Sequence, residues 1–237
     1  MTSAIDQERT FALSLGDSLL IHGHRISEWC GHAPILEEDI ALSNISLDYI
    51  GQAKHLLEFV AKTSPSKCTA DELAFFRNAE EFKSFTMVSL PNGDFAQTIL
   101  KIHLFGLFLL RVFKSGLRFE SKDIQGVCEK GSTEVNYHLK HSEKWIEVFT
   151  EGTEESRERL THALKFLLPW TRELMDFEPL DINNRQAFET DIKKFLVLYR
   201  LDSFAFPDSA PKKTITHLQQ ILSVMQSVAR AHPGASW

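Results

Sequence analysis

Cysteine, glycine and proline are all scarce in this chain of 237 residues, which has three, 11 and 8 of them. Cys30, Cys68 and Cys128 are widely spaced and odd in number, and no two form a CxxC pair. They therefore support neither a disulfide framework nor a thiolate zinc site, and they indicate a reducing compartment. Few glycines and prolines beside 18 phenylalanines favour long, bulky helices over a fold of strands and turns.

An excess of positive charge and a long apolar run are also lacking. Lys plus Arg number 26 against 32 Asp plus Glu, for a net charge of -6, which argues against a nucleic-acid-binding protein. The longest apolar run, Leu104 to Leu110, is far shorter than the roughly 20 residues that span a bilayer. Asp6, Glu8 and Arg9 precede any apolar stretch, unlike a secretory signal. We expect a cytoplasmic protein that binds neither nucleic acid nor membrane.

Apolar residues recur at helical spacing along almost the whole chain. A first helix is predicted to end near Gly31, and Pro34 opens a second helix that is apolar on two faces. A helix that is apolar over most of its circumference is normally buried in the middle of a bundle. One face carries Leu36, Ile40, Leu47, Ile50 and Leu57, and the other carries Leu42, Tyr49, Ala53, Leu56 and Val60.

Cap and turn residues predict the other boundaries. Thr69 with Glu72 starts a short third helix, a turn at 91–94 precedes a fourth helix to about Phe113, and a fifth helix runs from about Lys122 to Phe149. Thr153 caps a sixth helix, which ends at Pro169. Asn183 starts a seventh helix, and Ser209 with Pro211 starts the last one. No strand-like alternation occurs. The sequence predicts a single all-α domain over 1–237, with four long helices as its bundle.

A large acidic helical bundle raises the question of a di-iron carboxylate site. Such sites use a Glu from each of two helices and Glu-x-x-His from each of two others, because residues at i and i+3 lie side by side on a helix. No Glu in this chain is followed by His at the third position, and no GxSxG, P-loop or GxGxxG motif occurs. The sequence therefore predicts no catalytic, cofactor-binding or metal-binding residue.

Three residues remain as candidates for a vestigial metal site. Glu134 and His138 are four residues apart on an inward seam of their helix, and Asp48 belongs to a polar stripe on the second helix. We favour a hydrogen-bonded core pair for the first two and a solvated or partner-facing side for the stripe, over remnants of a metal site. The stripe consists of Asn44, Asp48, Gln52 and His55.

Several segments together resemble the PaaC family, the structural ferritin-like subunit of the phenylacetyl-CoA epoxidase complex. They are GHRISEWCGHAP at 23–34, LEEDIAL at 36–42, LDYIGQA at 47–53, PNGDFA at 91–96, EVNYHLKHS at 134–142 and GTEES at 152–156. The matching blocks extend from about Leu15 to about Leu160, and the C-terminal quarter matches only in general character. Such a series, in this order, is a specific signal.

The resemblance implies a ferritin-like up-down four-helix bundle core with additional C-terminal helices. It also implies a subunit of a multicomponent monooxygenase that is itself non-catalytic. A separate ferritin-like subunit would carry the di-iron centre and epoxidise the ring of phenylacetyl-CoA, and a reductase with FAD and a 2Fe-2S cluster would supply electrons from NADPH. This chain would hold no cofactor and would scaffold the catalytic subunit, as a homodimer or within a heterotetramer. His22, His24 and the Phe-rich middle depart from the expected pattern and leave open which aromatic CoA ester is the substrate.

Two other hypotheses stay open at this point. The chain could be an active ferritin-like di-iron oxidase with a non-standard ligand set that includes Asp48, Glu134 and His138, or a helical adaptor unrelated to oxygenation. Metal content distinguishes the oxidase from the scaffold subunit. Co-purification with a second ferritin-like chain distinguishes the adaptor from both. The Phe-rich helix from Ile99 to Phe113 and the second helix with its two apolar faces are the expected contributors to a partner interface, and periodicity does not say which one faces the partner.

Overall fold

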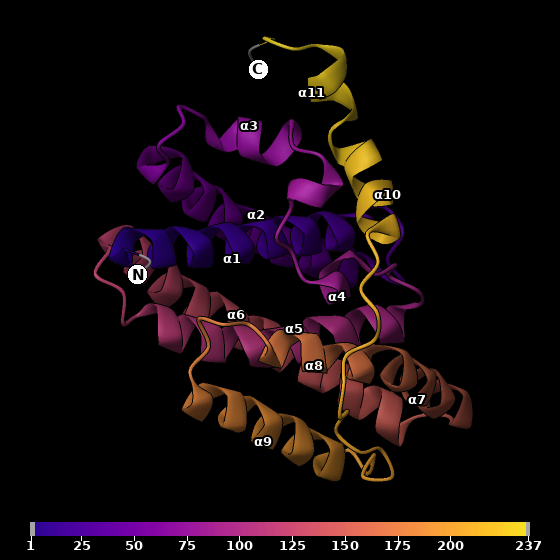
Figure 1. Ribbon diagram of the computed structural model, residues 1–237. Coiled ribbons are helices and arrows are strands. Elements are labelled where there is room, and N and C mark those ends of the chain that lie inside the picture. The colour runs from indigo at the N-terminus through magenta and orange to yellow at the C-terminus, as the bar shows by residue number, and fades with distance from the viewer. Residues whose placement is uncertain (1–2, 236–237) are drawn as a thin grey trace. The chain divides into compact units, whose positions relative to one another are not determined.

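The computed structural model describes residues 3–235, and within this range it contains helices and no strand, which confirms the all-α class (Figure 1). The chain divides into two compact units. Unit 1 comprises Met1–Pro91, Ser121–Val127 and Lys213–Trp237, and unit 2 comprises Asn92–Glu120 and Cys128–Lys212. The single domain over 1–237 and the four-helix bundle core stay predictions.

Unit 1 is built on two long helices, α1 (Ala4–Ser27) and α2 (Leu36–Thr63), which pack against each other (Figure 1). Their close approach depends on Gly23, where an added Cβ would lie 2.7 Å from Cγ1 of Ile50. At the same point the Ser46 hydroxyl donates a hydrogen bond of 2.8 Å to the Gly23 carbonyl. A larger side chain at position 23 would therefore push the two helices apart.

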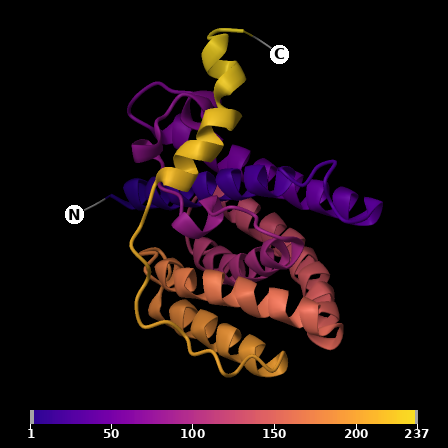
Figure 2. The same cartoon turned by 90° about the vertical axis from the view of Figure 1, so that its right-hand side faces the viewer.

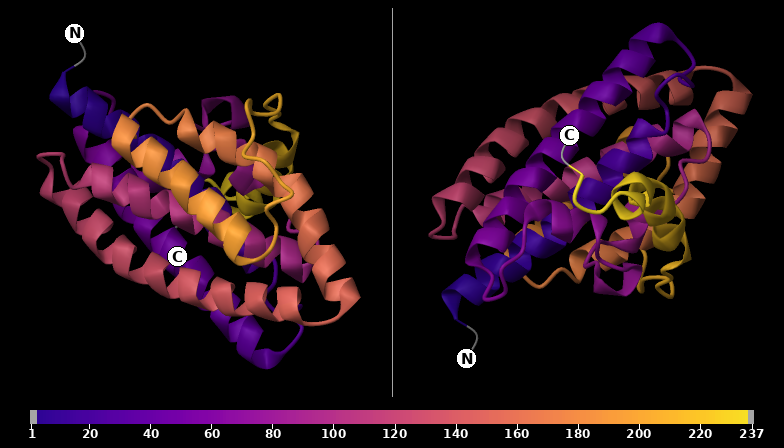
Figure 3. Two further views of the ribbon diagram at one scale, coloured as in Figure 1. Left: turned by 90° about the horizontal axis from the view of Figure 1, so that it is seen from below. Right: turned by 90° about the horizontal axis from the view of Figure 1, so that it is seen from above.

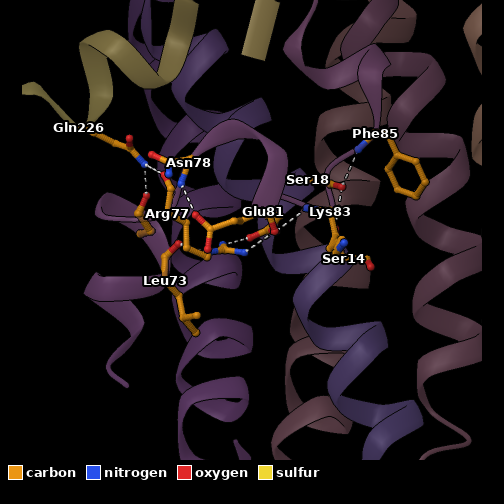
Figure 4. A network of polar contacts seen from close by, with 11 residues as sticks. Ser14, Ser18, Leu73, Arg77, Asn78, Glu81, Lys83, Phe85 and Gln226 are labelled. Atoms are coloured by element: carbon orange, nitrogen blue, oxygen red, sulfur yellow. Dashed lines mark hydrogen bonds and ion pairs between the residues drawn. The ribbon is translucent and has the colours of Figure 1, made fainter. Parts of the chain in front are cut away.

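Short helices complete unit 1. They are α3 (Ala70–Phe75), the 3-10 turn η1 (Ala79–Glu81), α4 (Thr86–Ser89), α10 (Thr216–Met225) and α11 (Ser227–Ala231). Figure 2 shows α10 and α11 in yellow beside the segment that carries α3. Gln226 makes this contact specific, because its side-chain amide donates to the carbonyls of Ala74 and Arg77 over 3.1 and 3.0 Å (Figure 4).

A buried ion pair fixes the segment after α3 onto α1. The Asp17 carboxylate is completely buried and accepts hydrogen bonds from both terminal nitrogens of Arg77, and the backbone N–H of Lys83 donates to it over 2.8 Å. Arg77 also donates to backbone carbonyls, including that of Glu81 (Figure 4). Its guanidinium lies over the ring of Phe82. A buried charge needs such a set of partners to be tolerated.

Unit 2 is built around α5 (Phe95–Gly116). The other elements are α6 (Lys122–Glu151), whose first residues belong to unit 1, α7 (Glu154–Leu167), the 3-10 turn η2 (Leu168–Trp170), α8 (Thr171–Met175) and α9 (Ile182–Leu198). α9 packs along α5 (Figure 3). Arg111 of α5 donates through Nε to Asp191 of α9 over 2.7 Å, and the rings of Phe108 and Phe188 meet edge to face.

α5 is also the one helix among the described residues that is long and apolar enough to cross a membrane. Its most apolar window has a mean hydropathy of 1.5, and 78 % of that window is buried within the protein. A core helix passes the same test of length and composition, so this finding is weak evidence for a membrane span.

The cap residues set most boundaries as predicted. Thr69 forms a complete capping box with Glu72, and the side chains of Asp94 and Thr153 accept from the backbone N–H groups of Gln97 and Ser156. The predicted start of the last helix is wrong, because α10 begins at Thr216. Lys212 and Lys213 would place positive charge at a helix N-terminus, where the helix dipole disfavours it.

The prediction that α2 is buried on both apolar faces is also wrong. The face with Leu42, Tyr49, Ala53, Leu56 and Val60 is buried. On the other face Leu36, Ile40 and Leu47 are 72 %, 55 % and 65 % exposed, whereas Ile50 is half-buried and Leu57 is buried, so the prediction fails only in the first part of that face. Helical periodicity identifies faces that avoid water, but it does not say whether this chain or another covers them.

Candidate functional site

Glu134 and His138 lie one turn apart on α6, in unit 2. The Glu134 carboxylate is 3.2 Å from the ammonium of Lys130, which lies one turn earlier and is well exposed, whereas the His138 side chain is buried. The carboxylate thus has a cationic partner on its own helix, and no metal is needed to neutralise its charge. Among the described residues, no group of three or more His, Cys, Asp and Glu side chains could hold a metal ion.

Asp48 lies on α2, in unit 1, and is half-buried. Its neighbour Tyr49 is completely buried, and the Tyr49 ring lies 5.0 Å from the imidazole ring of His22 on α1. Burial, and to a smaller extent the charge of Asp48, raises the pKa of Tyr49 well above its usual range, so the phenol stays protonated. The predicted polar stripe is not uniform: Asn44 and His55 are exposed, whereas Gln52 is buried.

One buried polar contact within unit 2 joins two residues that the sequence analysis did not select. His103 of α5 and Ser142 of α6 are both buried, and His103 Nδ1 lies 3.0 Å from the Ser142 hydroxyl. Because the Ser142 hydroxyl donates to the Leu139 carbonyl over 3.0 Å, it accepts from His103, whose Nδ1 therefore carries the proton. Burial lowers the pKa of His103 to about 3, so the imidazole is neutral at neutral pH.

A groove of about 670 Å³ opens beside His103 in unit 2. Its apolar wall is formed by Leu107, Phe195 and Leu198, and the Phe195 ring lies 4.9 Å from the imidazole of His103. The Tyr199 phenol also lines it, and burial together with the charge of Glu143 raises the pKa of Tyr199 to about 12. A neutral imidazole and a protonated phenol provide hydrogen-bonding groups here but no activated nucleophile.

Lys101 is a third residue that the sequence analysis did not select. It lies on α5, is completely buried, and donates through Nζ to the side-chain carbonyl of Asn92 over 3.2 Å. No sequence motif marks Lys101, because its burial depends on the packing of α5 and not on its spacing from other residues along the chain.

Two comparisons with known proteins cover nearly the whole chain. Residues 2–198 match the model of the family described as phenylacetic acid catabolic protein. The chain is also 31 % identical, over 249 residues, to one of the subunits of the 1,2-phenylacetyl-CoA epoxidase of Escherichia coli (strain K12). That alignment includes 98 % of this chain and 100 % of the relative.

Proposed function

Because the chain belongs to the phenylacetic acid catabolic protein family, which confirms the predicted resemblance, we propose that it is a structural, non-catalytic subunit of a phenylacetyl-CoA epoxidase. In this proposal it scaffolds a separate catalytic subunit with a di-iron centre, and a reductase with FAD and a 2Fe-2S cluster delivers electrons from NADPH. The complex would work in the cytoplasm in aerobic phenylacetate catabolism.

The absence of any Glu-x-x-His pair from the full sequence carries the proposal. A di-iron site needs two such pairs and two further carboxylates that converge on the same metals. The candidate residues do not fit this set. Glu134 pairs with Lys130. Asp48 is the one carboxylate in the polar stripe of α2, in which it is followed by Gln52 and His55. No step of the reaction is therefore assigned to this chain.

Rigid positioning is what such a subunit would contribute. The Asp17–Arg77 pair in unit 1 and the His103–Ser142 contact in unit 2 each fix one long helix against a neighbouring segment. A rigid partner surface can hold the helices of a catalytic subunit in place. An error of about 1 Å at reacting groups can lower a rate about 100-fold, so a subunit without chemistry can still be required for activity.

The alternative is an active ferritin-like di-iron oxidase that uses Asp48, Glu134 and His138 with a non-standard set of ligands. It predicts stoichiometric metal in the isolated chain, which the structural role does not. His138 is the feature in its favour, because it is a buried imidazole on a bundle helix.

Metal loading of the purified chain tests the proposal. The chain is incubated anaerobically with Fe(II), freed of excess metal, and analysed for iron and manganese beside a Glu134→Gln variant. We expect metal near zero in both proteins. About two metals per chain, lost in Glu134→Gln, would mean that the chain is an oxidase. Co-expression with the catalytic subunit then tests the scaffold: the two chains should co-purify, and the catalytic subunit alone should have little epoxidase activity.

A further inference from the structure

One ring nitrogen of His103 has no partner in the part of the chain that the structure describes. Nδ1 donates to the Ser142 hydroxyl, and the imidazole makes no other hydrogen bond to residues 3–235. Because Nδ1 carries the proton, Nε2 keeps an unused lone pair that can accept a hydrogen bond. The residue is only 2 % exposed, and polar atoms of buried side chains nearly always have a partner. This acceptor therefore lacks the partner that its burial calls for.

The groove of about 670 Å³ beside His103 gives access to this nitrogen. His103 lines the groove, and since Nδ1 is turned toward Ser142 on α6, the opposite edge of the ring is the one that can face the open space. Nε2 is also not one of the polar atoms in the described residues that are fully enclosed without a partner. Small-molecule sites commonly have volumes of about 300–1,000 Å³. A small molecule in the groove can thus donate a hydrogen bond to Nε2.

The wall of the groove next to His103 is apolar and aromatic. The Phe195 ring lies 4.9 Å from the imidazole at an interplanar angle of 35°, and it lies 5.2 Å from the ring of Tyr199. Leu107 of α5 and Leu198 of α9 continue this wall. Aromatic rings pack favourably with their centroids about 4.5–7 Å apart. The wall therefore suits a flat ring that carries few polar atoms.

The charged groups that line the groove favour neither sign of charge. Asp191 and Lys193 each already pair with a residue of opposite charge. Glu143 and Lys194 remain, one of each sign, and neither forms an ion pair with the described residues. Moving an ion out of water is costly unless an opposite charge meets it. The groove has no excess of either charge to offset that cost, so a neutral molecule fits it best.

We propose that this groove binds a neutral phenol, whose hydroxyl donates a hydrogen bond to Nε2 of His103 and whose ring packs against Phe195. The acceptor selects a ligand with an O–H group, the aromatic wall selects a ring, and the balanced charges select against ionic substituents. Because the imidazole is neutral at neutral pH, Nε2 stays available as an acceptor under ordinary conditions. The inference is independent of the proposed function, since the site lies within unit 2 and needs neither a metal nor a second subunit.

A comparison of phenol with toluene tests the hydrogen bond, because toluene replaces the hydroxyl by a methyl group with little change of shape. Binding to the purified full-length chain is followed by NMR titration. Phenol should bind saturably with a Kd of about 1 mM, which is the range for a ligand of so few atoms. Toluene should bind at least about tenfold more weakly, since it leaves Nε2 unpaired. A groove that is merely apolar would prefer toluene, because water solvates toluene less well than phenol.

Labelling of the histidine ring nitrogens with ¹⁵N locates the site in the wild-type chain. The Nε2 resonance of His103, assigned by its loss in His103→Phe, should move to lower frequency as phenol is added, because this nitrogen accepts the hydrogen bond. The same variant should lose the preference for phenol over toluene. The matched control is His162→Phe on α7, which replaces an exposed histidine outside the groove and should bind phenol like the wild type. Circular dichroism establishes that both variants fold.

Three results would overturn the proposal. They are no saturable binding of phenol at about ten times the expected Kd, tighter binding of toluene than of phenol by the wild-type chain, and an Nε2 resonance of His103 that stays in place while phenol binds. The first two use only the wild-type protein, so they decide the question even if His103→Phe does not fold.

Discussion

The two units stabilise their long helices by different kinds of buried polar contact. Unit 1 uses a charged pair, the fully buried Asp17 with the half-buried Arg77, whereas unit 2 uses a buried neutral pair, His103 with Ser142. The charged pair needs additional donors and acceptors from the segment after α3, and it has them. The neutral pair needs only one further acceptor, the Leu139 carbonyl. A buried charge requires a network around it, while a neutral pair fits between two helices without one.

The largest expected effect is in unit 1. Asp17→Ala leaves the Arg77 guanidinium buried without its carboxylate and should lower the free energy of unfolding by about 3–5 kcal/mol. Urea denaturation measures it. The control is Asp181→Ala in unit 2, which removes an ion pair with the well-exposed Arg118 and should cost about 1 kcal/mol for that pair, plus the helix cap. Equal losses in the two variants would contradict the difference between the units.

Low pH should destabilise unit 2 through the protonation of His103. The pKa of His103 is lowered from 6.5 to about 3 in the folded state, so between these pH values the unfolded chain binds more protons. This residue therefore contributes stability above pH 6.5 that is lost as pH falls toward 3, by up to about 1.4 kcal/mol per pH unit.

His103→Phe removes this proton linkage and keeps an aromatic ring against Phe195. We expect the variant to lose less stability than the wild type between pH 6.5 and 4 when both are unfolded in urea. An unchanged pH dependence would mean that His103 titrates normally and is not sealed from water.

Removal of the hydroxyl of Ser142 should have an intermediate effect. Ser142→Ala leaves the Nδ1–H group of His103 buried without its acceptor, which costs about 1–3 kcal/mol. The double variant Ser142→Ala with His103→Phe should be more stable than Ser142→Ala alone, because no unpaired donor remains. Thermal unfolding of the two proteins measures the difference, and additive losses would contradict the hydrogen bond.

Alanine substitutions of two glycines in unit 1 should change the free energy of unfolding in opposite directions, and these are the smallest expected effects. Gly51→Ala should raise the free energy of unfolding by about 0.5–1 kcal/mol, since the new methyl group meets open space in a helix interior. Gly23→Ala should lower it, because its Cβ would lie 2.7 Å from Ile50. A loss of stability in Gly51→Ala would show that α2 is already covered there.

The sequence predicted those features of the fold that are local. The predicted caps at Thr69 and Thr153 act over three residues, and the structure confirms both, as it confirms a helix start after the predicted turn at 91–94. The start of α10 was missed because Pro211 resembles a helix start while the buried apolar residues begin only at Leu218. The sequence analysis named this helix as a contributor to a partner interface, but periodicity did not say that Leu36, Ile40 and Leu47 are its exposed apolar residues.

The polar contacts of the two units could not be predicted in the same way. Asp17 and Arg77 are 60 residues apart, and His103 and Ser142 are 39 residues apart. Such pairs are defined by packing, and no motif with a fixed spacing marks them. The missing Glu-x-x-His pairs, by contrast, are a local feature that is read directly from the sequence, and the lack of a di-iron ligand set stays a prediction from it. The structure adds the partner of Glu134.

Reconstituted activity tests the central claim most directly. The chain with both Asp48→Asn and Glu134→Gln, two substitutions that keep side-chain shape, is combined with the catalytic subunit and the reductase, and the rate of phenylacetyl-CoA epoxidation is measured beside the wild type. A scaffold whose carboxylates do no chemistry should support a rate within about twofold of the wild type. A folded, fully assembled complex whose rate falls by several orders of magnitude would show that this chain carries part of the active site.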